Sequence, residues 1–252
     1  FDFIYGLPKQ SVKEFVSTIE TAISLLPNRL VTFSYAHLPS LFKRQQILEK
    51  AGLPLQNEKL EMFEEAARTL RAAGYVPIGM DHFVLPDDDL SVALQHHTLH
   101  RNFQGYCPRH ITAQVYAFGV SGISQLDEAY AQNTKDISTY ITQVNAGRLP
   151  IQRGYALAPW QRITREVIEC IMCNNGINWH DMAQRLHCTV TDIWQAVHYN
   201  EAQLQTLQAD GLITFDAEEV RVMPEGMPFV RNVATAFDPM MRNSHLLFSK
   251  PV

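Results

Sequence analysis

Apolar runs alternate with helical segments over the first 85 residues, and this alternation constrains the fold more than any other feature of the sequence. The runs are FDFIYGL (1–7), RLVTFSYAHLP (29–39) and YVPIGMDHF (75–83). Helices are expected between them, over 11–26, 41–50 and 57–73. Strands separated by helices are typical of a parallel sheet. We therefore predict an α/β fold in which the three strands pair in parallel.

Local signals support the helix boundaries. Ser11 and Glu14 have the spacing of a capping box, in which each side chain accepts a bond from the other residue's backbone N–H. Apolar side chains then recur at helical spacing, beginning with Phe15 and Ile19. Gly74 suits the left-handed position that follows the last turn of a helix, so it should end the helix over 57–73.

Polar residues directly follow the apolar runs. Pro8 comes after the first run, His37 after the second, and Asp81 and His82 after the third. Ligands collect at the carboxyl ends of strands in such sheets, so we expect Pro8, His37 and His82 to lie at one end. An Asp–His pair can serve acid–base chemistry or orient a ligand. It can equally be a structural pair that holds a loop.

The second half of the chain has a different character. A strand and turn suit 113–124, and a helix suits 136–147. After Pro159 a first helix is expected over 160–174. A second helix, a turn, a long helix over about 191–209 ended by Gly211 and a hairpin over 212–222 follow, which is a winged-helix pattern. A last helix is expected over 228–242. The predicted division is a barrel region over 1–125, a connecting region over 126–158 and a mainly helical, winged-helix-like domain over 159–252.

Charge and hydropathy argue against several classes of partner. The net charge of −5 gives no support for a nucleic-acid or anionic-membrane partner. No apolar stretch reaches the ~18 residues that a transmembrane helix needs. The winged-helix pattern taken alone would indicate a transcription regulator, which we keep as a third interpretation.

Since the chain opens on Phe1 inside an expected strand, we expect a fragment of a longer protein.

The four cysteines are too few for a disulfide framework in a chain of 252 residues, so a reducing cytoplasm is expected. Cys170 and Cys173 form a C-x-x-C that could bind zinc or act in redox chemistry. No second pair lies at zinc spacing, and both cysteines lie in an apolar helical stripe. Buried core thiols are therefore the favoured interpretation.

Two further groups could bind a ligand. His96, His97 and His100 could hold a metal, but no paired carboxylate or cysteine completes the site, which favours a hydrogen-bonded loop. The segment FQGY (103–106) could bracket a flat ligand or form a packed aromatic turn. Spacing alone does not decide between these two alternatives. No metal ligand and no catalytic residue is assigned.

Motifs spread over nearly the whole chain resemble the oxygen-independent coproporphyrinogen III oxidase family. They are FDFIYGLPKQS (1–11), FSYAHLP (33–39), GMDHFVLPDDDL (79–90), LHRNFQGY (99–106), YAQN (130–133), TREVIECIMCN (164–174) and FVRNVATAFD (229–238). The resemblance implies part of a radical S-adenosylmethionine (β/α) barrel. It also implies oxidative decarboxylation of two propionates of coproporphyrinogen III, giving protoporphyrinogen IX in heme biosynthesis.

The family uses a [4Fe-4S] cluster on a C-x-x-x-C-x-x-C motif, together with two molecules of S-adenosylmethionine. No cysteines in this sequence have that spacing, so the cluster is expected to be absent and the fragment alone inactive. The resemblance places Asp2 at the second S-adenosylmethionine, and Ala36 and Ile123 at the first. Phe103 and Gln104 match the place where the family closes over the cofactor.

The substrate and the other partners follow from the same resemblance. Coproporphyrinogen III carries four carboxylates, which an Arg fork can bind bidentately. The candidates are Arg101, Arg109 and Arg231, although each could instead be a structural or surface arginine. A cytoplasmic monomer is expected, with an electron donor and acceptor that the sequence does not identify. The alternative function is a heme-binding or heme-delivery relative without decarboxylase activity.

Overall fold

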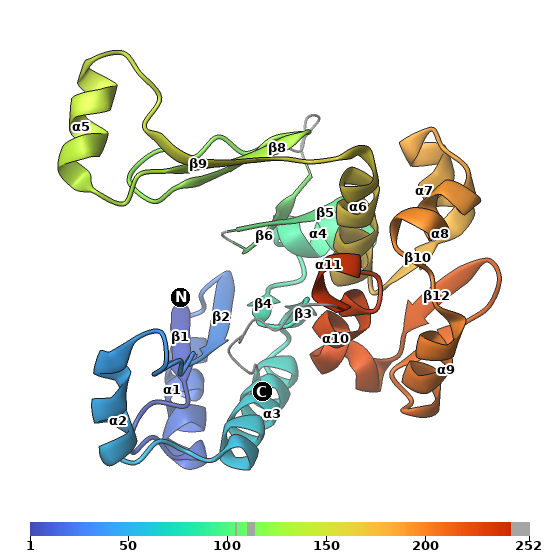
Figure 1. Ribbon diagram of the computed structural model, residues 1–252. Coiled ribbons are helices and arrows are strands. Elements are labelled where there is room, and N and C mark those ends of the chain that lie inside the picture. The colour runs from blue at the N-terminus through green and yellow to red at the C-terminus, as the bar shows by residue number, and fades with distance from the viewer. Residues whose placement is uncertain (104, 110–113, 243–252) are drawn as a thin grey trace. The chain divides into compact units, whose positions relative to one another are not determined.

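The computed structural model describes residues 1–103, 105–109 and 114–242, and these form two compact units that divide between Gln95 and His96 (Figure 1). The elements of the first unit are β1 (Asp2–Tyr5), α1 (Val12–Ser24), β2 (Arg29–Ser34), a 3-10 turn (Lys43–Gln45), α2 (Gln46–Lys50), α3 (Gln56–Ala72), β3 (Val76–Ile78), β4 (His82–Val84) and α4 (Asp89–Gln95).

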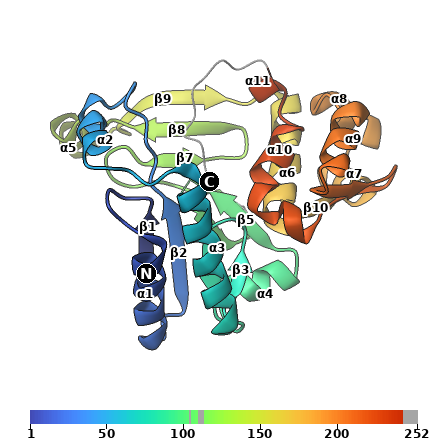
Figure 2. The ribbon, with the colours of Figure 1, turned by 90° about the horizontal axis from the view of Figure 1, so that it is seen from below.

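The sheet of the first unit has the strand order β1-β2-β4-β3. β1 and β2 pair in parallel, from Asp2 opposite Val31 to Tyr5 opposite Ser34, as the sequence predicted. Helices α1 and α3 cover one face of this sheet, because their buried side chains share a core with the strands (Figure 2). The expected capping box of Ser11 and Glu14 is present at α1, and Gly74 follows α3 with φ +89°.

The prediction that the third apolar run forms a single parallel strand is wrong. The run breaks into β3 and β4, which pair antiparallel, and β4 also pairs antiparallel with β2. The cause is the turn from Gly79 to Asp81, where Gly79 adopts a φ of 59° and reverses the chain. Asp81 lies beside Thr32 and His82 pairs with Val31 within β2, whereas His37 follows the end of β2 at Ser34 and Pro8 follows the end of the parallel β1. That Pro8, His37 and His82 lie together stays a prediction.

The acidic loop that follows β4 has a structural role at one of its aspartates. Asp88 is buried, and its Oδ2 accepts a bond of 2.6 Å from Nε of Arg29 at the start of β2. Its Oδ1 accepts from the backbone N–H of Leu90 at 2.8 Å, at the beginning of α4. Asp88 therefore links the loop to both a strand and a helix terminus.

The expected helix over 41–50 is only partly helical. Phe42 has φ −121° and ψ 82°, outside the helical region, so the segment begins with the 3-10 turn and continues as the short α2.

The elements of the second unit are, in chain order, β5 (Leu99–Asn102), β6 (Gly105–Pro108), β7 (Ile123–Gln125), β8 (Ala129–Asn133), α5 (Ile137–Asn145), β9 (Ile151–Ala156), α6 (Pro159–Asn174), β10 (Gly176–Asn178), α7 (Trp179–Leu186), α8 (Val190–Ala196), α9 (Glu201–Ala209), β11 (Ile213–Phe215), β12 (Glu219–Val222), a 3-10 helix (Pro224–Phe229), α10 (Val230–Thr235) and α11 (Pro239–Arg242).

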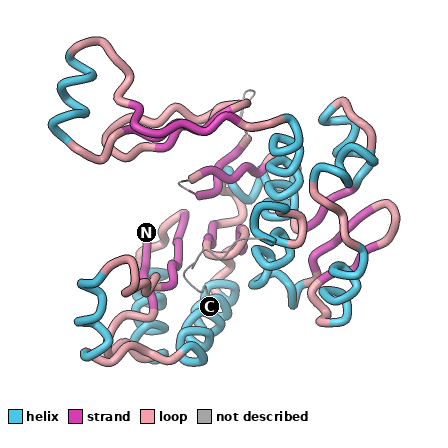
Figure 3. Tube along the Cα trace, viewed as in Figure 1, coloured by secondary structure: helices cyan, strands magenta, loops and turns pink. Residues whose placement is uncertain are grey.

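The described residues of the second unit form three separate sheets. β5 and β6 form a hairpin, and β7, β8 and β9 form an antiparallel sheet. Figure 3 shows α5 as an excursion of the chain between β8 and β9. The third sheet has the strand order β10-β12-β11 and lies beside helices α7, α8 and α9. Its strands β11 and β12 form the expected hairpin, so the winged-helix pattern with a hairpin over 212–222 is confirmed.

The long helix expected over 191–209 is wrong, because the chain forms two helices there. α8 ends at Ala196, His198 adopts a φ of 49°, and Asn200 starts α9 by accepting a bond from the backbone N–H of Gln203. The last expected helix is likewise divided. Asp238 caps α11 through the N–H of Met240, so the chain begins a new helix at Pro239.

The core of the second unit joins α6 to the winged-helix elements. Its fully buried side chains include Ile171, Trp179, Ile193 and Phe237.

The division of the chain into three regions, with boundaries after residues 125 and 158, was based on changes in sequence character, and it stays a prediction. Within the described residues, no helix combines the length and hydropathy required to cross a bilayer.

Candidate ligand-binding site

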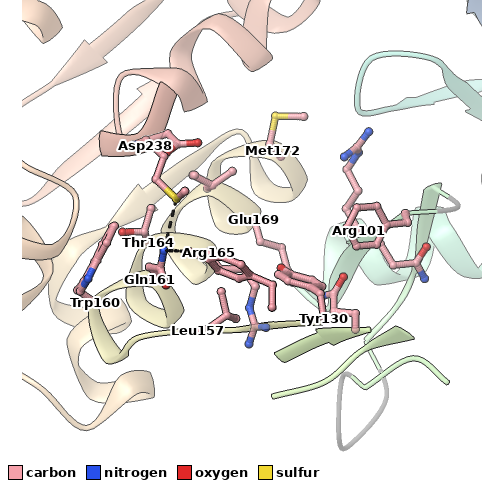
Figure 4. A pocket seen from close by; sticks show the side chains of 16 residues that line it. Arg101, Tyr130, Leu157, Trp160, Gln161, Thr164, Arg165, Glu169, Met172 and Asp238 are labelled. Atoms are coloured by element: carbon pink, nitrogen blue, oxygen red, sulfur yellow. Dashed lines mark hydrogen bonds between the residues drawn. The ribbon is translucent and has the colours of Figure 1, made fainter. Parts of the chain in front are cut away.

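A cavity of about 470 Å³ lies along α6 in the second unit, and we call it the aromatic cavity. Four aromatic side chains, two cations and two neutral polar side chains are prominent in its lining: Phe103, Tyr130, Tyr155, Trp160, Arg101, Arg165, Gln161 and Thr164. Figure 4 labels Tyr130, Trp160, Arg101, Arg165, Gln161 and Thr164 of this lining, together with Glu169, Met172 and Asp238. A concave, largely aromatic site with a few polar groups has the general character of a small-molecule site.

One face of α6 forms much of this lining. Trp160, Thr164, Ile168 and Met172 recur at intervals of four residues, so the helical period places them on one side. The helix starts at Pro159, which suits the first helical position because its missing N–H would be unpaired there anyway. The sequence thus fixes both the start of the helix and the face that it presents to the cavity.

Gln161 is the fixed polar group at one end of the aromatic cavity. Its Nε2 donates to the hydroxyl of Tyr155 at 2.6 Å and contacts the sulfur of Met240 at 3.4 Å (Figure 4). Its Oε1 accepts from the N–H of Ala158 at 2.9 Å. These bonds set the orientation of the Tyr155 ring relative to the helix.

Arg165 is a largely buried cation that donates hydrogen bonds to backbone carbonyls. Its Nη1 and Nη2 donate to the backbone carbonyls of Leu126 and Asp127 at 3.0 and 2.9 Å. Among the described residues, the nearest carboxylate oxygens, on Asp127 and Glu166, lie 3.8 Å away. Its Nε is buried without a hydrogen-bond partner. The guanidinium also lies over the ring of Tyr130, 5.9 Å from the centroid.

Tyr130 forms the opposite wall together with Phe103. The two rings meet edge to face with their centroids 5.5 Å apart. Burial raises the pKa of the Tyr130 hydroxyl, and the charge of Arg165 acts against that rise. The hydroxyl therefore stays protonated near neutral pH and can donate a hydrogen bond.

An ion-pair network lies beside the cavity, and it consists of His100, Arg109, Glu166 and Glu169. Nδ1 of His100 lies 2.5 Å from Oε1 of Glu169, and Nη2 of Arg109 lies 2.9 Å from Oε2 of Glu166 and 3.3 Å from Oε1 of Glu169. Burial alone would raise the pKa of Glu166, but nearby arginines, Arg109 foremost, outweigh it and lower the pKa.

The candidates named from sequence are distributed over both units. Asp2 and Ala36 lie in the first unit, both exposed, at the start of β1 and just after β2. Arg101 and Phe103 line the aromatic cavity in the second unit. Ile123 begins β7 and is half-buried. Gln104 lies outside the described residues.

The other candidates occupy different surroundings. Arg109 contributes to the ion-pair network, and Arg231 is exposed on α10. Asp81 and His82 do contact each other, with 2.6 Å between Oδ1 and Nδ1, and the histidine is buried. His100 of the histidine group binds a carboxylate, as the hydrogen-bonded interpretation expected.

The cysteine interpretation holds for Cys173, which is buried in the core of α6, while Cys170 is half-buried and donates to the carbonyl of Gly176 at 3.4 Å. Burial raises the pKa of both thiols.

Sequence reasoning missed Arg165, Tyr130 and Glu169 as lining residues of the aromatic cavity. The signal for Arg165 and Glu169 was available, because charged residues interrupt an otherwise apolar helix in TREVIECIMCN (164–174).

Comparison with known proteins connects this chain to one family. Residues 157–229 match the HemN C-terminal domain family. Oxygen-independent coproporphyrinogen III oxidase of Pseudomonas aeruginosa is 39% identical over 241 residues, which cover 94% of this chain and 51% of that protein. The same-named protein of Escherichia coli is 37% identical, covering 96% of this chain and 52% of the relative.

A solved structure gives the same relationship. Coproporphyrinogen III oxidase (HemN) from Escherichia coli, described as a radical SAM enzyme, matches with a TM-score of 0.85 at 37% identity. The match covers 95% of this chain and 54% of the solved one. The chain thus spans about half the length of the relatives that it matches. The α/β fold expected from the resemblance is confirmed, with mixed rather than purely parallel sheets.

Proposed function

We propose that this chain, which is homologous to the oxygen-independent coproporphyrinogen III oxidases over about half of their length, is part of such an oxidase. The reaction would be oxidative decarboxylation of two propionates of coproporphyrinogen III, yielding protoporphyrinogen IX in heme biosynthesis. The observation that carries this proposal is the sequence identity along nearly the whole chain. The aromatic cavity, with its cations, adds a site of suitable chemistry.

The cysteines of this chain do not fit the cluster that the radical S-adenosylmethionine family implies. None has the C-x-x-x-C-x-x-C spacing, and burial of Cys173 disfavours the thiolate that iron requires. In the part of the chain that the structure describes, no three His, Cys, Asp or Glu side chains come together as metal ligands could. We assign no step of the radical chemistry to these residues and propose that the 252-residue chain alone has no turnover.

The contribution of this chain to the cofactor would come from a few residues. Asp2 offers an exposed carboxylate at the start of β1, which suits the hydroxyl or amino groups of S-adenosylmethionine. Ala36 and Ile123 would contribute backbone or apolar contact. Phe103, whose side chain is exposed, could stack on a flat group, and Gln104 remains part of the same proposal.

The contribution to the substrate would come from arginines that meet its propionates. Arg101 has favourable surroundings, since it lines the aromatic cavity and lies over the ring of Tyr106 at 5.6 Å. Arg109 already binds two carboxylates in the ion-pair network, and Arg231 is exposed on α10. We propose all three as candidates, with Arg101 first. A cytoplasmic monomer would agree with four free thiols.

The test is an anaerobic assay of coproporphyrinogen III decarboxylation. The complete protein should form protoporphyrinogen IX, whereas the 252-residue chain should form none and should show no iron–sulfur absorbance after reconstitution. Cluster absorbance in the 252-residue chain would contradict the assignment. Heme binding by a complete protein without decarboxylation would support a heme-delivery role instead. Arg101→Met in the complete enzyme should raise KM more than it lowers kcat, because it removes substrate binding.

A further inference from the structure

We propose that Arg165 anchors the carboxylate of a flat, ring-bearing ligand in the aromatic cavity. The inference deepens the proposed function and rests on it for the identity of the ring, which would be a propionate-bearing pyrrole of the porphyrinogen. The carboxylate anchor itself follows from the surroundings of Arg165.

The first argument is the charge of Arg165. The side chain is only 15% exposed, and a buried charge is costly unless it is paired. Two backbone carbonyls hold the guanidinium in place, but both are neutral. Its nearest carboxylates, on Asp127 and Glu166, are too distant at 3.8 Å for hydrogen bonds. Asp127 and Glu166 are already bonded to Arg162 and Arg109 at 3.0 and 2.9 Å. Arg165 is thus a fixed cation whose two neighbouring carboxylates, at 3.8 Å, make their closer contacts with other arginines.

The second argument is the shape and chemistry of the rim. Phe103, Tyr155 and Trp160 are 60%, 48% and 40% exposed, and all three line the same cavity. Exposed aromatic side chains gathered at one concave site mark a binding surface rather than an ordinary solvated one. Aromatic faces accept a flat ring by stacking or edge contact. A ring that packs among these side chains would place its acidic substituent inside the cavity that Arg165 also lines.

The third argument is size. The cavity of about 470 Å³ lies in the lower part of the ~300–1,000 Å³ range of small-molecule sites. This volume suits one substituted ring rather than a whole tetrapyrrole, so the remaining rings would extend through the open mouth. Arg101 lines the same cavity and could meet a second acidic side chain. Glu169, which also lines it, is paired with Arg109 at 3.3 Å and so repels an entering anion less.

The test is a binding titration of the 252-residue chain with coproporphyrin III, the stable oxidised porphyrin with four propionates, followed by its Soret band. The matched uncharged probe is the tetramethyl ester. The acid should bind saturably and the ester at least tenfold more weakly. Arg165→Met should weaken binding of the acid roughly tenfold or more, because a charge-assisted bond is lost. Arg165→Lys should fall between, because lysine cannot form the bidentate fork.

Arg221→Met is the matched control. Arg221 is an exposed arginine that pairs with Glu219 at 2.7 Å and does not line the aromatic cavity, so its loss should change affinity less than twofold. Four results would each overturn the proposal: no saturable binding, equal binding of the ester, an unchanged Kd in Arg165→Met, or an equal loss in Arg221→Met. If Arg165→Met does not fold, an unchanged Kd in Arg165→Lys overturns it. Binding needs no cluster, so this result is independent of turnover by the complete protein.

Discussion

His100 on β5 and Glu169 on α6 meet through a contact of 2.5 Å between Nδ1 and Oε1, and this contact fixes the strand against the helix. Their side chains are only 3% and 10% exposed. Arg101 and Phe103 follow His100 on the strand side of the aromatic cavity, whereas Arg165 lies one turn before Glu169 on the helix. This contact therefore holds the two walls of the cavity at their mutual distance.

Removing this carboxylate should be costly. Glu169→Gln leaves Arg109 and His100 without the charge that they share, so we expect the free energy of unfolding to fall by about 3 kcal/mol. Urea unfolding of the 252-residue chain measures this change. Glu128→Gln is the control, because Glu128 and Arg162 form an exposed pair, and it should change stability by no more than ~1 kcal/mol. Similar losses for both variants would mean that the buried pair has no special role.

The pH dependence of stability should reflect Glu166. Its pKa in the folded chain lies below its ordinary value of 4.5, so the unfolded chain binds the proton more readily. The stability that Glu166 contributes is thus fully present above about pH 4.5 and is lost as pH falls through the lower folded pKa. Urea unfolding of wild type and Glu166→Gln from pH 3 to pH 7 measures this. The difference between them should shrink towards acid, and a difference that grows below pH 4.5 would contradict the assigned sign.

The turn that creates β3 and β4 depends on a glycine. Gly79 has a φ of 59°, a left-handed conformation that costs a residue with a Cβ about 1–2 kcal/mol. Gly79→Ala should therefore lower the free energy of unfolding by roughly that amount. Gly154→Ala on β9 should cause no such loss, because an added Cβ there meets only the carbonyl oxygen of Tyr130 at 3.8 Å. If both variants lowered the free energy of unfolding equally, the positive φ of Gly79 would not be what the turn depends on.

Local chemistry explains which parts of this fold could be predicted. The capping box at Ser11 and Glu14 and the hairpin after Gly211 depend on residues close in sequence, and both formed as expected. The split of the third strand depended on Gly79 adopting a positive φ, which the apolar pattern around it concealed. The break before α9 had a local signal as well, because Asn200 is a favoured residue at a helix start.

The candidate site was harder to predict, because its important contacts join distant segments. Arg101 and Phe103 were found through the resemblance, and both line the aromatic cavity. Arg165 was not singled out, since sequence spacing cannot show that its nearest partners are the backbone carbonyls of Leu126 and Asp127, about 40 residues away. That no carboxylate hydrogen-bonds directly to Arg165 is visible only once those segments come together.

The winged-helix region should not bind DNA. Residues 159–222 contain four arginines, no lysine and nine acidic residues, whereas phosphate contacts by Lys and Arg supply most non-specific affinity. Helices α8 and α9 carry Asp192 and Glu201 and no cation, and the buried side chains of Ile193 and Leu204 hold them on their own domain. An electrophoretic mobility shift at low salt, where non-specific binding is strongest, should show no complex. A salt-sensitive shift at micromolar protein would instead favour the transcription-regulator interpretation.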